Sequence, residues 1–108
     1  MNNSRLVLLQ QFYDEDPTDP FNGYALAMEY INVDARLSEK YLLELLDKHP
    51  NYLPTYYQAA TLLAENKSQE LIEAIYKKGL ELATIQNNTK IYQELQRAYR
   101  GYLDEMEE

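Results

Sequence analysis

Residues 49–83 read HPNYLPTYYQAATLLAENKSQELIEAIYKKGLELA, and this stretch decides the fold. Two prolines open it, an ENKS turn divides it and a KKGLELA segment closes it. Apolar residues on both sides of the turn recur at the spacing of one face of an α-helix. The stretch therefore predicts a helical hairpin, and it raises the question of whether that hairpin is one unit of a repeat.

Helical patterns continue on both sides of this hairpin. Clusters of Pro, Asn, Asp and Ser separate them, and no segment alternates in the way a half-buried strand does. Candidate N-caps precede four of the helices, namely Asp19, Asp34, Ser68 and either Asn88 or Thr89. The sequence predicts an all-α chain of about six helices. They are expected at 4–15, from Pro20 to about Asn32, at 35–48, from near Pro54 through Leu63, after Ser68 through Ala83, and at 88–106.

Two parts of the chain repeat one another. With an offset of 35, the set Phe21, Tyr24, Ala25 and Met28 matches the set Tyr56, Ala59, Ala60 and Leu63. With an offset of 34, the set Leu42, Leu45 and Leu46 matches the set Tyr76, Gly79 and Leu80. Self-similarity at this period is typical of stacked helical hairpins. We expect the small residues Ala25, Ala60 and Gly79 to lie where two helix backbones pack closely.

The two copies resemble the tetratricopeptide repeat (TPR) family. The first helix of each carries the family's sequence of a large aromatic, an apolar and then a small residue, and Pro50 stands where the family has its terminal proline. DPFNGYALAMEY followed by LLDKHPNYLPTYYQAATLL is similar to small bacterial two-repeat proteins of this kind. The chain departs from the pattern at Leu42 and Leu45 of the first copy, and at Ile72 and Thr84 of the second.

The resemblance implies a right-handed superhelical stack of antiparallel α-hairpins. Each hairpin has an apolar face that it cannot bury alone, and about three repeats are usually needed for stability. We therefore expect the first and last helices to act as caps on two repeats. The predicted organisation is one TPR-like domain, 1–108, with a capping helix at 4–15, repeats at 19–50 and 51–84, and a capping helix at 88–106.

Charge and composition exclude several kinds of partner. The chain has 108 residues and a net charge of −8, from 18 acidic and 10 basic side chains, and this charge disfavours nucleic acid. The apolar run at Leu6–Leu9 is too short for a signal peptide or a membrane span. The chain has no cysteine, which excludes disulfides and thiolate sites. We expect a cytoplasmic protein that binds neither nucleic acid nor membranes.

Catalytic motifs are missing from the sequence. His49 is the only histidine, and it precedes Pro50 at a predicted helix end, where a cation suits the helix dipole. No Gly-rich phosphate loop and no nucleophile elbow occurs. We expect no enzyme activity, no cofactor and no metal.

The resemblance places a partner-binding surface on the concave side of the stack, which the first helix of each hairpin lines. The partner is expected to be a peptide or another protein. One alternative is that Tyr30 and Tyr57 only cover neighbouring stripes. Another is that Arg97 and Arg100 pair with Glu94, Glu65 or Asp104 on a solvated face. The candidate residues are Asn22, Leu26, Glu29 and Tyr30 in the first repeat, Tyr57, Thr61 and Glu65 in the second, and Gln93, Arg97 and Arg100 on the last helix.

A second hypothesis for the function is structural self-association. Exposed apolar residues on the end helices would pair two chains into a homodimer. Exposure of Leu8, Leu9 or Tyr102 would favour this hypothesis, whereas a tyrosine-lined hollow between well-covered ends would favour the binding of a partner.

Overall fold

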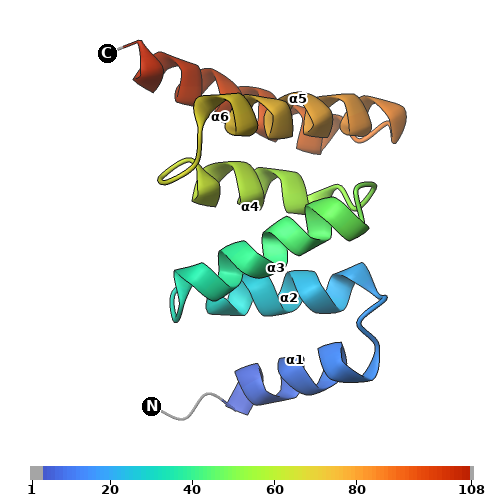
Figure 1. Ribbon diagram of the computed structural model, residues 1–108. Coiled ribbons are helices and arrows are strands. Elements are labelled where there is room, and N and C mark those ends of the chain that lie inside the picture. The colour runs from blue at the N-terminus through green and yellow to red at the C-terminus, as the bar shows by residue number, and fades with distance from the viewer. Residues whose placement is uncertain (1–3, 108) are drawn as a thin grey trace. The chain divides into compact units, whose positions relative to one another are not determined.

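The computed structural model describes residues 4–107, and this range contains helices and no strand (Figure 1). The prediction of an all-α chain of six helices is confirmed. The first and third helices have the bounds predicted from the sequence. The helices are α1 (Ser4–Glu15), α2 (Pro20–Tyr30), α3 (Ala35–Lys48), α4 (Pro54–Leu63), α5 (Gln69–Ile85) and α6 (Thr89–Met106).

Side chains cap four of the helices at their N-termini. The Asp19 carboxylate accepts the backbone N–H of Phe21 at 2.9 Å, and Asp34 caps α3 in the same way. Ser68 caps α5, and Asn88 rather than Thr89 caps α6. Each cap satisfies a backbone donor that has no partner inside its helix, so these residues set where the helices begin.

The chain divides into two compact units, one ending at Tyr52 and the other beginning at Leu53. Unit 1 contains α1, α2 and α3, and unit 2 contains α4, α5 and α6. The organisation of the chain as one domain with two repeats stays a prediction. Residues 1–3 and 108 of the predicted domain lie outside the described range.

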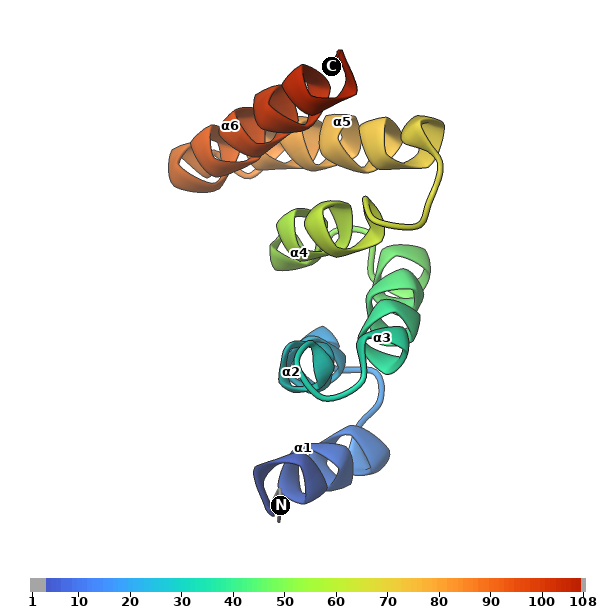
Figure 2. The ribbon, with the colours of Figure 1, turned by 90° about the vertical axis from the view of Figure 1, so that its left-hand side faces the viewer.

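In unit 1, α2 and α3 lie side by side as the two arms of a hairpin (Figure 2). The Ser38 hydroxyl of α3 is fully buried and donates to the Ala27 carbonyl of α2 at 2.7 Å. Leu42 and Leu45 of α3 are buried on the same side of the helix as Ser38. A short side chain at position 38 therefore lets the two helices approach closely.

The sequence predicted the wrong set of buried residues for α2. The buried residues of α2 are Gly23, Leu26 and Ala27, and none of the predicted core residues of this helix is fully buried. Ala27, rather than Ala25, is the small residue that approaches the next helix. The buried set of α2 matches the buried set of α4 with an offset of 33, not 35. The set that the repeat predicted for this helix is Phe21, Tyr24, Ala25 and Met28; Phe21 is exposed and the other three are half-buried.

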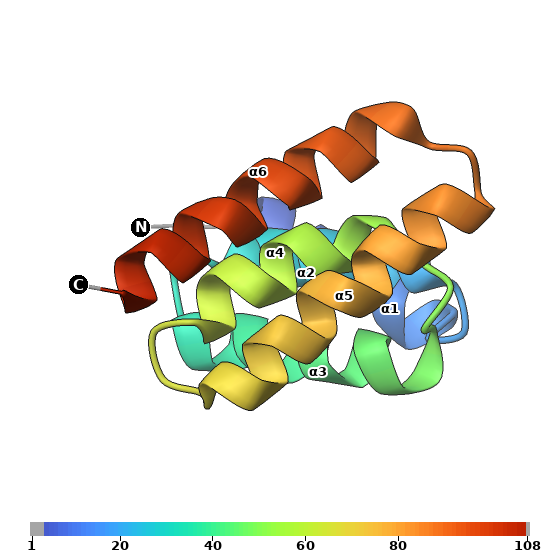
Figure 3. The ribbon, with the colours of Figure 1, turned by 90° about the horizontal axis from the view of Figure 1, so that it is seen from above.

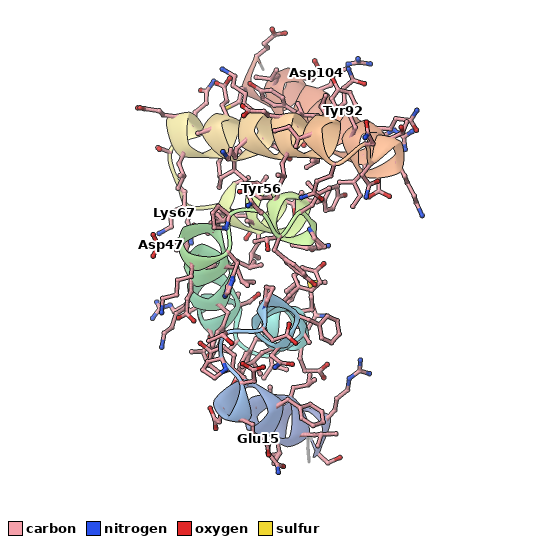
Figure 4. The ribbon with its side chains drawn as sticks, turned by 90° about the vertical axis from the view of Figure 1, so that its right-hand side faces the viewer. Glu15, Asp47, Tyr56, Lys67, Tyr92 and Asp104 are labelled. Carbon is pink, nitrogen blue, oxygen red and sulfur yellow. The ribbon has the colours of Figure 1, made fainter. Side chains whose placement is uncertain are left out.

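In unit 2, α5 packs against both α4 and α6 around Gly79. A Cβ atom added to Gly79 would lie 2.9 Å from Tyr56 Cβ and 3.0 Å from Leu95 Cδ1. Tyr56 lies between α4 and α5 (Figure 4), and α5 and α6 run antiparallel (Figure 3). The predicted close packing at Gly79 is confirmed by these short distances, and Ala60 is buried as expected.

Replacing Gly79 of α5 or Gly101 of α6 by alanine is expected to change the free energy of unfolding in opposite directions. Gly79→Ala is expected to lower the free energy of unfolding by about 1–2 kcal/mol, because overpacking outweighs the helix propensity gained. Gly101→Ala, with no atom within 4 Å of the added methyl, is expected to raise it by up to about 1 kcal/mol. Urea denaturation followed by circular dichroism measures both. Equal effects of the two substitutions would contradict the packing described for Gly79.

Candidate functional site

The side of α2 opposite its buried residues is apolar and exposed. Phe21, Ala25 and Met28 recur at positions i, i+4 and i+7, so they share one side of the helix, and Tyr24 borders them. The Phe21 side chain is 59% exposed, and the other three are half-buried. We call Phe21, Tyr24, Ala25 and Met28 the α2 outer face. These residues were predicted to pack in the repeat and so were not predicted as binding residues.

Two of the predicted α2 site residues hold α1 in place instead of facing solvent freely. The Asn22 side-chain amide donates to the carbonyls of Phe12, at 3.3 Å, and Asp16, at 3.0 Å. The Glu29 carboxylate lies 3.2 Å from the Arg5 guanidinium Nε. These contacts join the edge of α2 to α1 at two points, so Asn22 and Glu29 border the α2 outer face rather than form it.

Tyr30 and Leu26 also differ from the expectation of an open binding surface. The Tyr30 ring stacks on the Tyr41 ring of α3, with centroids 5.9 Å apart and planes 5° apart. Tyr30 thus covers a neighbouring side chain, which is the alternative to partner binding that was stated for this residue. Leu26 has 0% exposed surface. The prediction that Leu26 contacts a partner is wrong, because it lies on the core side of α2 with Gly23 and Ala27.

A shallow hollow lies at the end of α3, beside the start of α2. It has a volume of about 340 Å³. The Tyr52 ring, which is half-buried, packs edge-on against the Tyr24 ring with centroids 5.7 Å apart. Burial raises the pKa of Tyr52. The aromatic surface of α2 therefore extends to this hollow through Tyr24 and Tyr52. The hollow is lined by Pro20, Lys48, His49, Pro50, Asn51 and Tyr52.

Two of the predicted site residues of the second repeat lie on the exposed side of α4, and the third follows the end of the helix. Tyr57 is 37% exposed, Thr61 is exposed one turn later, and Glu65 is exposed in the turn after Leu63. The Thr61 hydroxyl donates to the Tyr57 carbonyl at 2.9 Å. This side of α4 is opposite the buried Tyr56, Ala59, Ala60 and Leu63. It carries one aromatic ring among polar groups, so it is more polar than the α2 outer face.

The predicted residues of α6 share the side of that helix opposite its buried Leu95. Gln93, Arg97 and Arg100 are all exposed. Among residues 4–107, neither arginine forms an ion pair, so the proposed pairing with Glu94, Glu65 or Asp104 does not occur there. Two arginines without carboxylate partners can meet an acidic or amide group of another molecule.

Tyrosine–glutamate hydrogen bonds tie neighbouring helices together in both units. In unit 1 the Tyr13 hydroxyl of α1 donates to the Glu44 carboxylate of α3. In unit 2 the Tyr99 hydroxyl of α6 donates to the Glu73 carboxylate of α5 at 2.6 Å, and this bond lowers the pKa of Glu73. The Tyr99 ring also stacks on Tyr76, with centroids 4.9 Å apart. Much of the chain's tyrosine content thus serves helix packing.

These contacts predict a loss of stability at high pH. The pKa values of Tyr13, Tyr76 and Tyr99 are each raised from 10.0 to about 12, mainly by the Glu44 bond for Tyr13 and by burial for the other two. The folded state therefore holds these protons more tightly than the unfolded state. The contribution of these tyrosines to the free energy of unfolding is fully present below pH 10.0 and is lost as the pH rises through about 12. Urea unfolding at several pH values across this window measures the decline, and Tyr13→Phe should make it shallower. A free energy of unfolding that stays level or rises there would contradict the assignment.

Within the described range, the side chains do not assemble a metal site. No group of three or more His, Cys, Asp or Glu side chains in residues 4–107 is placed to hold a metal ion. None of the helices in the same range is both long enough and apolar enough to cross a bilayer.

Comparison with known proteins finds two similar solved structures. A crystal structure of a tetratricopeptide repeat domain protein from Salinibacter ruber matches with a TM-score of 0.74 and 31% sequence identity, over 80% of this chain and 97% of that chain. A solution NMR structure of a tetratricopeptide repeat domain protein from Salinibacter ruber matches with a TM-score of 0.72 and 33% identity, over 81% and 89% of the two chains. No protein-family model and no curated protein matches the sequence. The likeness to the two solved structures extends over most of this chain and nearly all of each neighbour.

Proposed function

The chain belongs to the tetratricopeptide repeat family, and from this premise we propose that it is a non-catalytic module that binds a peptide or another protein. Its fold is that of a general protein-interaction module. Repeats of helical hairpins present extended surfaces to partners. The fold does not by itself assign the partner, so the function rests on the exposed side chains.

The observation that carries the proposal is the exposure of aromatic side chains on the outer sides of α2 and α4. Phe21 and Tyr57 face solvent while the opposite sides of their helices are buried. Aromatic residues are enriched where proteins bind one another, since they bury a large area at low entropic cost. These two helices are the first arms of the two predicted repeats, and we propose that their exposed sides belong to the concave, partner-binding face expected of a TPR stack.

Polar groups beside the aromatic residues and on α6 would add selectivity. We assign Thr61 of α4, Glu65 in the turn after α4, and Gln93, Arg97 and Arg100 of α6 to hydrogen bonds and ion pairs with the partner. Asn22, Glu29 and Tyr30 are assigned to the border of the surface, since each already contacts another part of unit 1. The cytoplasmic location stays a prediction.

A peptide selection tests the proposal. Peptides chosen from a random display library for binding to the chain would be measured by titration calorimetry against Phe21→Ala, Tyr57→Ala and Ile85→Ala. Ile85 is the matched control, because it is 68% exposed and lies at the end of α5. We expect Phe21→Ala or Tyr57→Ala to weaken binding about tenfold and Ile85→Ala to leave it unchanged. Peptides that bind all three variants equally well would overturn the proposed surface.

The second candidate function is structural self-association through the end helices. The observation in its favour is that α1 contains no fully buried residue, while Val7, Leu8 and Phe12 are 68%, 47% and 44% exposed. Leu9 and Tyr102, the other residues named for this hypothesis, are half-buried. Light scattering across a dilution series decides the question. A dimer that dissociates on dilution and is lost in Leu8→Glu supports self-association, and a mass of 12.7 kDa at every concentration excludes it.

A further inference from the structure

Two contacts fix how α1 lies along α2 in unit 1. Arg5, at the start of α1, pairs with Glu29 near the end of α2. The carbonyl of Phe12, two turns later in α1, accepts from Asn22 near the start of α2. One edge of α1 therefore runs antiparallel along the Asn22–Glu29 edge of α2, and residues just outside this line belong to one surface.

Apolar side chains occupy the solvent side of that line on both helices. Leu8 and Phe12 are one turn apart on α1, and the α2 outer face lies beyond the Asn22–Glu29 edge. Leu8, Phe12 and Phe21 are 47%, 44% and 59% exposed, whereas Ala25 and Met28 are half-buried, so both helices expose apolar residues on this side. Contiguous exposed apolar surface of this kind marks an interaction site more often than single exposed residues do. We call Leu8, Phe12, Phe21, Ala25 and Met28 the α1–α2 apolar surface.

Carboxylates lie at one end of this surface. Four acidic residues occupy the last turn of α1 and the loop before α2; three of them lie between Phe12 and Phe21 at this end, whereas Asp14 lines a hollow with Gln10 and Tyr30 on another side of α1. Unit 1 as a whole has nine acidic and four basic side chains, a net charge of −5. Of the four basic residues, Arg5 is paired with Glu29, and Arg36 and Lys40 lie on the side of α3 opposite the buried Leu42 and Leu45. The fourth, Lys48, lines the hollow at the end of α3 together with Pro20. The four acidic residues are Asp14, Glu15, Asp16 and Asp19.

The helical backbone of this surface restricts what can cover it. The N–H and C=O groups within α1 and α2 are bonded inside their helices, so they offer no ladder of hydrogen bonds to an extended peptide. In a helical partner the backbone N–H and C=O groups are already hydrogen-bonded within the helix. Such a helix can pack its apolar side against α1 and α2 by ordinary helix packing. The acidic end favours Lys or Arg beside that stripe. A second copy of the chain would bring carboxylates against carboxylates.

We propose that the α1–α2 apolar surface binds an amphipathic helix of another protein, with Lys or Arg flanking its apolar stripe. This inference rests on the proposed function as a protein-binding module, and it names the chemistry of the partner.

Three designed peptides of about 15 residues, long enough for helix to form on binding, test this chemistry. The first has leucine on one helical face and lysine on the other. The second has glutamate in place of lysine, and the third has the composition of the first in an order without an apolar face. Fluorescence anisotropy measures their binding to the full chain, to Phe21→Glu and to Ile85→Glu. The two variants make the same change in charge at exposed positions, 59% and 68% exposed, so their difference isolates the surface.

We expect the leucine–lysine helix to bind the full chain at least about tenfold more tightly than the other two peptides, and less tightly as salt is raised. Phe21→Glu should weaken this binding about tenfold or more relative to Ile85→Glu. Phe12→Glu provides a second variant on the other helix, and thermal melting checks that each variant is folded.

Other results overturn the inference in distinguishable ways. If the leucine–glutamate helix binds equally well and Phe21→Glu weakens it, the surface binds helices and the proposed function stands, but the inferred charge of the partner is wrong. If the scrambled peptide binds as tightly as the leucine–lysine helix, the attraction is only electrostatic and no docking surface exists. If peptides from the display selection bind independently of Phe21, Phe12 and Tyr57, the proposed function fails as well.

Discussion

Replacing Tyr76 by alanine is expected to lower the free energy of unfolding by about 3–5 kcal/mol. Tyr76 is 2% exposed, and its ring stacks on Tyr99 and lies 6.1 Å from Tyr102, centroid to centroid. Alanine would leave a cavity among these rings and remove the contact by which α5 holds α6. For a chain of this size, each 1 kcal/mol lowers the melting temperature by roughly 4–8 °C.

Urea denaturation followed by far-UV circular dichroism measures this loss. Tyr76→Phe is the control at the same position, since it keeps the ring and its stacking and removes only the hydroxyl. We expect Tyr76→Phe to change the free energy of unfolding by less than about 1 kcal/mol. An alanine variant as stable as the wild type would show that Tyr76 is not at the centre of the unit 2 core.

Leu95→Ala is expected to lower the free energy of unfolding by about 2–5 kcal/mol. Leu95 has 0% exposed surface and is the only fully buried residue of α6 within the described range. Its side chain reaches the space that a Cβ on Gly79 would occupy, so it fixes α6 against α5 at their closest approach. The substitution therefore removes the main apolar anchor of the last helix.

Hydrogen exchange distinguishes detachment of α6 from a general loss of stability. In Leu95→Ala, amides of α6 should lose protection more than those of α4. Met106→Ala is the matched control, because Met106 is an apolar residue of the same helix that is 51% exposed, and its loss should cost well under 1 kcal/mol. Equal costs for Leu95→Ala and Met106→Ala would refute the role of Leu95 as the anchor.

Helix positions in this chain follow from local signals. Asp19, Asp34 and Ser68 were predicted as caps and do accept backbone N–H groups at the starts of α2, α3 and α5. A capping side chain lies two or three residues from the backbone N–H that it accepts, so caps can be predicted from the local sequence. Periodicity also identifies most of the core sides of α3, α4 and α5, although each of these helices has one large exposed apolar residue, namely Leu43, Tyr57 and Ile85.

The core side of α2 could not be predicted in this way, because this helix is apolar on two sides. Phe21, Ala25 and Met28 form one apolar row, and Leu26 and Ala27 belong to the other. Periodicity alone favours neither row, and aligning Phe21 with Tyr56 selected the larger side chains. The structure buries the smaller ones, since Ala27 must approach Ser38 closely enough for a hydrogen bond of 2.7 Å.

That error in register displaced the predicted binding residues of the first repeat by about half a helical turn. Leu26 was predicted on the surface and Phe21 in the core. In the structure Leu26 is buried and Phe21 is exposed. The residues of α4 were unaffected, because its outer side is polar apart from Tyr57 and the pattern there is unambiguous. A helix with apolar residues on both its core side and its outer side is itself a sign of a binding surface.

The most direct test of the central claim is an NMR map of the contacted residues. A peptide from the display selection would be titrated into isotope-labelled chain, and amide shifts recorded for every resolved residue. The largest shifts are expected at Phe21–Met28 of α2, and from Tyr57 in α4 to Glu65 in the turn that follows it. Shifts that instead cluster on the outer side of α3, around Arg36 and Lys40, would contradict the claim that the first helices of the hairpins bind the partner.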